Sequence, residues 1–164
     1  MTRKMFLTLM FALLIAPLAA QAQPWAAAPG TGAIDEAALG IYQVDNGKLF
    51  YNSTGSINNI LARYNVTDTS ATGAPSWTTF ELRYFDNSPS GSVNAQLVRL
   101  SPGGGTISTI AACNSTDSGT LTVLACPLAG ATVNFNAGYI YQVVVTLSRS
   151  STSADPWFLG ARLY

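Results

Sequence analysis

The sequence contains no histidine, and this absence removes several kinds of chemistry. Histidine is the commonest general base near neutral pH, the commonest metal ligand in proteins and a member of every Ser-His-Asp triad. A phosphate-binding loop is missing as well, because the glycine-rich run at residues 101–106 has no lysine and lies between two strand-like stretches. We therefore expect no catalytic residues, no cofactor and no metal ion.

Charged side chains are scarce, at 10% of the chain against about 25% in an ordinary soluble domain. Beyond residue 22, six basic side chains stand against eight acidic ones, a net charge of −2. A general nucleic-acid binder needs a basic stripe that replaces the phosphate counterions, and electrostatic docking on anionic lipid also needs basic clusters. The charge balance argues against both partners, and a surface rich in Ser, Thr, Asn, Gln and Gly suits an extracytoplasmic protein.

A long apolar run occurs only at the start of the chain. Arg3 and Lys4 precede the mostly apolar residues 5–18, and Ala20-Gln21-Ala22 forms a small-x-small cleavage site. An N-terminal membrane anchor is the alternative, but the run is shorter than the roughly 20 residues that span a bilayer. We expect a signal peptide at residues 1–22, a linker or N-terminal segment at 23–36 and one domain at 37–164. The mature chain then has no membrane span and is exported, periplasmic or extracellular.

Short runs of β-branched and aromatic residues alternate with turn signals from residue 37 onward. This spacing predicts an all-β fold, an antiparallel, jelly-roll-like β-sandwich of eight or nine strands, although a barrel shares the pattern. Asn46-Gly47 fits a type I′ turn that places Tyr42 opposite Tyr51. Two long strands follow near the end of the chain. Their expected inward residues are Tyr139, Tyr141, Val143, Val145 and Leu147, and then Leu159, Ala161 and Leu163.

Residues 80–100 predict a second hairpin, with Phe80 opposite Leu97, Tyr84 opposite Val93 and a turn near Ser88-Pro89. Its polar face is usually just the solvated side of an antiparallel sheet. The alternative is a shallow binding platform with Trp77 or Phe85 as a stacking face at its edge. The candidate binding residues of this platform are Trp77, Glu81, Arg83, Asn94 and Gln96.

Cys113 and Cys126 are the only cysteines of the chain. An even count in an exported chain predicts a disulfide bridge. A hairpin that turns at Gly119-Thr120 brings the two residues opposite each other, whereas a turn near Thr116 separates them too far for bonding. We expect the bridged arrangement.

These features favour an exported, non-enzymatic β-sandwich with a structural or binding role at the cell surface or in the periplasm. The alternative is a carbohydrate-binding module-like protein. The expected partners are a neutral polysaccharide or further copies of the chain, the latter through an outward apolar set that includes Ile140, Val144, Phe158 and Tyr164.

A glycoside hydrolase is the third hypothesis, because paired carboxylates are the remaining catalytic option. Such an enzyme needs two carboxyl groups roughly 5–10 Å apart. The candidate pairs are Asp35 with Glu36 and Glu81 with Asp86. The members of each pair differ in parity along a strand, so they point to opposite faces.

Overall fold

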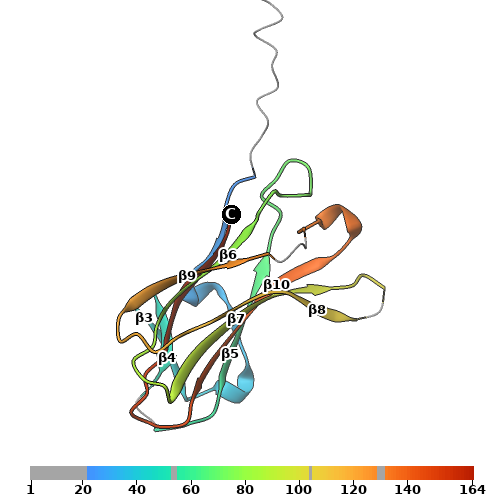
Figure 1. Ribbon diagram of the computed structural model, residues 1–164. Helices are drawn as coiled ribbons and strands as arrows, with labels where there is room; N and C mark the ends of the chain where they lie inside the picture. The colour runs from blue at the N-terminus through green and yellow to red at the C-terminus, as the bar shows by residue number, and fades with distance from the viewer. Residues whose placement is uncertain (1–21, 53–54, 104, 129–131) are drawn as a thin grey trace, which may run out of the picture.

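The computed structural model describes residues 22–52, 55–103, 105–128 and 132–164, and the signal expected at residues 1–22 lies almost wholly outside them. The described residues form two antiparallel β-sheets packed face to face (Figure 1), which confirms the all-β sandwich. They contain eleven strands, more than the expected eight or nine, because short pairings near the N-terminus add to the count. Within this part of the chain, no helix has the length and apolar character needed to cross a membrane.

The first sheet has the strand order β3-β4-β11-β6-β9, and β1 also pairs with β11. Its members are β1 (Trp25–Ala27), β3 (Tyr42–Asp45), β4 (Lys48–Tyr51), β6 (Thr79–Phe85), β9 (Leu121–Pro127) and β11 (Trp157–Leu163). The second sheet has the order β2-β5-β10-β7-β8. Its members are β2 (Ala33–Ile34), β5 (Ile60–Val66), β7 (Gly91–Leu100), β8 (Ile107–Asn114) and β10 (Ile140–Arg149). Three 3₁₀ turns complete the described elements: η1 (Pro29–Thr31), η2 (Glu36–Ala38) and η3 (Phe135–Ala137).

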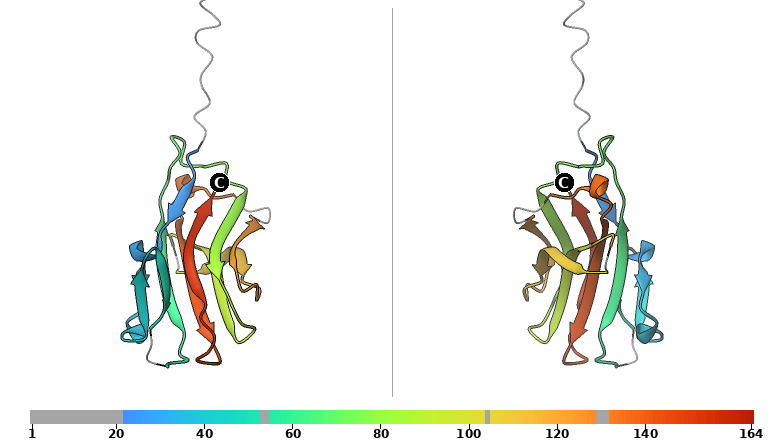
Figure 2. Two further views of the ribbon diagram at one scale, coloured as in Figure 1. Left: turned by 90° about the vertical axis from the view of Figure 1, so that its left-hand side faces the viewer. Right: turned by 90° about the vertical axis from the view of Figure 1, so that its right-hand side faces the viewer.

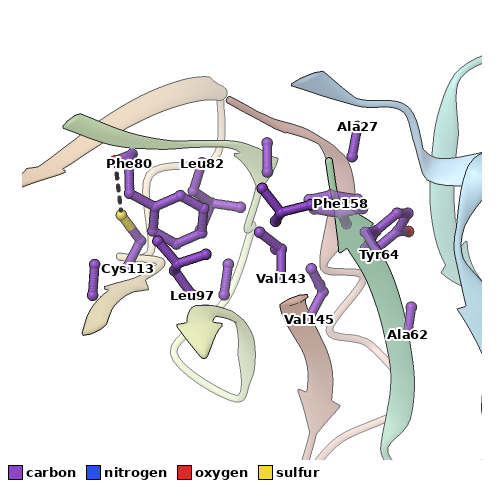
Figure 3. Packing of buried hydrophobic residues seen from close by; sticks show 14 of the residues in the cluster. Ala27, Ala62, Tyr64, Phe80, Leu82, Leu97, Cys113, Val143, Val145 and Phe158 are labelled. Atoms are coloured by element: carbon purple, nitrogen blue, oxygen red, sulfur yellow. Dashed lines mark hydrogen bonds between the residues drawn. The ribbon is translucent and has the colours of Figure 1, made fainter. Parts of the chain in front are cut away.

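The hydrophobic core lies between the sheets, where alternate residues of every long strand point inward. Figure 3 shows Leu82 and Phe158 of the first sheet lying close to Leu97 and Val143 of the second. The inward set expected on the long strand is confirmed for Tyr141, Val143, Val145 and Leu147, all of which are buried. Alternation with period two is what a sheet needs in order to bury one face and solvate the other.

The first hairpin has the predicted register. Tyr42 lies opposite Tyr51, and Asp45 opposite Lys48. Asn46 and Gly47 both have positive φ angles, 48° and 75°, as a type I′ turn requires. The two turn residues therefore predict this pairing correctly.

The second expected hairpin is wrong. β6 pairs with β11 and β9, whereas β7 pairs with β10 and β8, so these strands belong to opposite sheets. Their apolar faces do meet, but across the core rather than side by side. Asp86 stabilises the segment that connects β6 to β7. It is 1% exposed and accepts hydrogen bonds from the Ser115 hydroxyl and the Ser88 backbone N–H.

The last strand departs from the expected parity because of a β-bulge. The register of β11 against β6 shifts between Phe158 and Gly160. Phe158 is consequently fully buried and Leu159 is half-buried, the reverse of the expectation, while Ala161 and Leu163 point inward as expected. Gly160 has a φ of 148°, and a Cβ at this position would lie 3.0 Å from the Ala27 carbonyl oxygen. Only glycine adopts this backbone and allows β1 to approach so closely.

The segment expected as a linker, residues 23–36, contributes to both sheets. Trp25 pairs with Leu163 in the first sheet, where β1 lies along the end of β11 (Figure 2). Ala33 pairs with Arg63 in the second sheet. The sandwich therefore begins before residue 37.

The Cys113–Cys126 disulfide is confirmed, with the two Cα atoms 5.9 Å apart. The hairpin proposed to create it is wrong, because β8 and β9 are edge strands of opposite sheets. The bridge therefore ties the two sheets together along one side of the sandwich.

A candidate binding surface on the first sheet

The five predicted binding residues do not form one surface. Glu81 and Arg83 lie on the outer face of the first sheet, while Asn94 and Gln96 lie on the outer face of the second. Trp77 is only 4% exposed, packs edge-on against Phe135 and donates its indole N–H to the Gln23 carbonyl oxygen. The expected platform is divided because β6 and β7 lie in different sheets.

A row of three aromatic side chains crosses the outer face of the first sheet, and we call Phe50, Trp157 and Phe85 the aromatic row. Trp157 of β11 lies opposite Phe85 of β6. On its other side β11 runs antiparallel to β4, with Phe158 opposite Leu49, so the next position places Trp157 opposite Phe50. The Phe85 and Trp157 rings stack with centroids 4.3 Å apart. All three side chains are half-buried, so part of each reaches the surface.

Lys48 covers part of the aromatic row. Its ammonium lies 3.9 Å from the Trp157 ring centroid and 4.8 Å from that of Phe50. A cation over an aromatic face is attracted by the ring quadrupole, by about 0.5–1 kcal/mol at exposed sites. The Trp157 Nε1 atom is buried and has no hydrogen-bond partner among the described residues.

A groove of about 210 Å³ continues the same face along β11. Its floor consists of Gly160 and small side chains of residues 26–28, and its walls include the Arg83 and Arg162 side chains. The Arg83 Nε atom lies 2.7 Å from a carboxylate oxygen of Glu81, which is nearly buried. The groove therefore offers two guanidinium groups beside an apolar floor, and the Glu81 carboxylate fixes the position of the Arg83 guanidinium.

The aromatic row and the groove were only partly foreseeable from the sequence. Glu81, Arg83 and Phe85 were identified because they alternate with the buried residues of β6. Phe50 is outward in the hairpin register that was predicted correctly, so that register was a usable signal for it. Arg162 is likewise outward in the expected register, because Ala161 and Leu163 on either side of it are inward as predicted. Trp157 gave no such signal, because the bulge at Gly160 reverses the parity of β11 before that residue.

Two members of the proposed carboxylate pairs, Asp35 and Asp86, are held by local hydrogen bonds. Asp35 accepts a hydrogen bond from the Ala37 backbone N–H and lies 3.3 Å from Arg63, and these two interactions lower the pKa of the Asp35 carboxyl. Glu81 lies on an outer face, whereas Asp86 is buried under Ser115. No cluster of three His, Cys, Asp or Glu residues able to hold a metal ion occurs in the described part of the chain.

Comparisons with known proteins find a likeness at the level of structure. No family model matches the chain, and no curated protein matches it. A family 36 carbohydrate-binding module in complex with calcium and xylotriose is 14% identical, with a TM-score of 0.49 over 85% of this chain and 99% of that one. The family 11 module from Clostridium thermocellum, in complex with a mixed-linked tetrasaccharide, is 8% identical, with a TM-score of 0.46 over 86% of each chain. A family 29 module from Piromyces equi is 6% identical, with a TM-score of 0.39 over 86% of this chain and 78% of that one. At these identities and TM-scores the likeness carries no conclusion about what this chain binds.

Proposed function

We propose that the protein binds polysaccharide through the outer face of its first sheet, as a carbohydrate-binding module-like protein. The observation that carries this proposal is the aromatic row, which lies beside a groove lined by the guanidinium-bearing residues Arg83 and Arg162. The C–H groups of a sugar ring pack on apolar and aromatic surfaces, while its hydroxyls accept hydrogen bonds from guanidinium N–H groups. This face offers both kinds of contact side by side.

The arrangement suits an extended ligand. The aromatic row crosses three adjacent strands, a span of about 10 Å at the usual strand spacing. The groove then continues along β11 as far as Arg162. A chain of several sugar units reaches all of these contacts, whereas a single sugar ring reaches only some of them.

Lys48 is the side chain that a ligand displaces in this proposal. Its ammonium occupies the ring faces of Trp157 and Phe50, which are the surfaces on which a sugar ring stacks. The lysine side chain is flexible, and the attraction that holds it is small. Once it moves, the ring faces of Trp157 and Phe50 become available to a sugar ring.

Binding to polysaccharides of different linkage tests the proposal. The protein is mixed with insoluble cellulose, xylan, mannan and chitin and, in affinity gels, with soluble β-glucans. We expect binding to at least one of them, and Trp157→Ala should weaken it tenfold or more, which corresponds to about 1.4 kcal/mol. Ile140→Ala is the matched control, since it removes an exposed apolar side chain from β10 in the second sheet. Absence of binding to every polymer, or equal losses in both variants, would refute this function.

Export is part of the same proposal. The Cys113–Cys126 bridge supports it, because disulfides persist in oxidising compartments and are rare in the cytosol. Determining the N-terminal residue of the protein produced in its native cell tests this, and a start at Gln23 is the expected result.

Self-association is a second candidate function, favoured by the edge strand β9. Leu121 is 68% exposed and Val123 is 59% exposed on the outward face of this strand. An edge strand with exposed apolar side chains is a template for pairing with another chain. Light scattering at increasing concentration tests this, and a dimer that dissociates in the Leu121→Lys variant is the result that supports it.

A further inference from the structure

A second concave site lies on the side of the sandwich away from the disulfide. It is a cleft of about 400 Å³ between the N-terminal segment and the strands β5 and β10. This volume falls within the range of small-molecule sites. The lining residues come from β1, β2, β5, β10 and η1, and they include Trp25, Arg63, Tyr64, Asn65 and Gln142.

The floor of the cleft is preformed. The Tyr64 hydroxyl donates to the Pro29 carbonyl oxygen at 3.1 Å, and the ring packs against Phe158 with centroids 5.4 Å apart. A Cβ on Gly32 would lie 2.4 Å from this ring, so glycine is what lets η1 close over it. Trp25 is held beside it by the pairing of β1 with Leu163.

The polar wall of the cleft presents hydrogen-bonding groups in a fixed arrangement. Gln142 donates through Nε2 to the Asn65 Oδ1 atom at 2.9 Å, and this hydrogen bond does not use the Asn65 side-chain N–H groups or the Gln142 Oε1 atom. Arg63 lies on the same face of β5, two residues before Asn65. One of its guanidinium nitrogens pairs with the Asp35 carboxylate. The wall thus offers adjacent donors and an acceptor.

The electrostatics of the cleft favour a neutral ligand. The single cationic side chain of its described lining, Arg63, is 3.3 Å from the Asp35 carboxylate. A ligand carboxylate or ammonium would lose water without gaining an unpaired opposite charge. A hydroxyl group both donates and accepts, so neighbouring hydroxyls match an amide donor beside an amide acceptor.

From this geometry we infer that the cleft is a second binding site, for one or two units of neutral sugar. The site is separate from the aromatic row, because its polar wall lies on the second sheet whereas the aromatic row lies on the first. A free small sugar and the end unit of a neutral glycan present the same hydroxyls to it.

Calorimetry and amide NMR titration of the whole protein test the inference. The probes are glucose, galactose, mannose, xylose, cellobiose and maltose at concentrations up to about 50 mM, where weak binding of millimolar Kd is still detected. We expect at least one of them to shift the amide signals of Arg63, Asn65 and Gln142. Gln142→Leu should weaken binding fivefold or more. The matched control is Gln96→Leu, which makes the same change on β7 of the same outer face, outside the cleft.

The outcomes separate this inference from the polysaccharide proposal. Small-sugar binding that is lost in Gln142→Leu and kept in both Gln96→Leu and Trp157→Ala establishes the second site. Comparison of cellobiose with cellohexaose then shows whether the cleft takes a chain end or only a free small sugar. The inference is overturned if none of the probes shifts these signals, or if Gln142→Leu and Gln96→Leu bind equally well while circular dichroism shows both to be folded.

Discussion

Removal of the Cys113–Cys126 bridge should destabilise the protein, because the unfolded chain gains conformational entropy when the cross-link is lost. The two residues are 13 apart in the sequence, and closing a loop of this length contributes about 3 kcal/mol in the chain-entropy model. Replacing both by alanine should therefore lower the free energy of unfolding by about 3 kcal/mol. At roughly 2–4 °C per kcal/mol for a chain of this size, the melting temperature should fall by about 6–12 °C.

Urea unfolding followed by tryptophan fluorescence measures this effect. The wild-type protein in reductant is the control and should match the Cys113→Ala/Cys126→Ala variant. The m-value should rise in both, because an unfolded chain without the cross-link exposes more surface. An unfolding free energy within about 1 kcal/mol of the oxidised protein refutes the reasoning.

An unchanged m-value would point to a different mechanism. β8 and β9 are edge strands of opposite sheets, so the bridge could act by holding the folded sheets together. Amide exchange in β9 would then rise in the folded variant well above the exchange expected from the loss of global stability. Exchange that rises equally in all strands supports the unfolded-chain account.

The parts of the fold that the sequence predicts best are those decided by neighbouring residues. The β3–β4 register follows from Asn46-Gly47, because few residue pairs adopt positive φ at both turn positions. The inward faces of β5 and β10 follow from alternation. The bridge was predicted from the number of cysteines and the expected compartment.

Strand partners were not predictable in the same way. Alternation states which face of β6 is buried, but it says nothing about whether β7 lies beside β6 or across the core from it. Both arrangements bury Phe80 and Leu97. The buried Asp86 that fixes the crossing resembles, in the sequence alone, the polar residue of an ordinary turn.

In the candidate binding surface, one residue decides which side chains of β11 point outward. Counting parity back from Leu163 through a regular strand places Trp157 in the core and Phe158 outside. The bulge at Gly160 inserts one residue and reverses both. A single glycine in a strand is compatible with a bulge but does not specify one, so Trp157 was missed. The cleft beside β5 and β10 could not be predicted from the sequence either. Its walls come from five separate segments, and the sequence does not state how these segments pair.

Three further predictions test the bulge and the core. Phe158→Ala should cost about 3–5 kcal/mol of unfolding free energy and Leu159→Ala less than about 1.5 kcal/mol; equal costs in urea unfolding would contradict the bulge. Gly160→Val should destabilise the protein by about 2 kcal/mol or more and raise amide exchange in β1, because its Cβ meets the Ala27 carbonyl; unchanged exchange there would argue against this contact. The last prediction concerns alkaline pH. Burial raises the pKa of Tyr51 to about 12, although the nearby Arg149 guanidinium opposes the shift. The folded protein thus holds this proton more tightly than the unfolded chain, whose tyrosines titrate near 10. The resulting stability, up to about 3 kcal/mol, is complete below pH 10 and is lost as the pH rises toward 12. Urea unfolding between pH 9 and 12 should therefore show a steeper fall for the wild type than for Tyr51→Phe, and parallel curves would show that Tyr51 titrates normally in the fold.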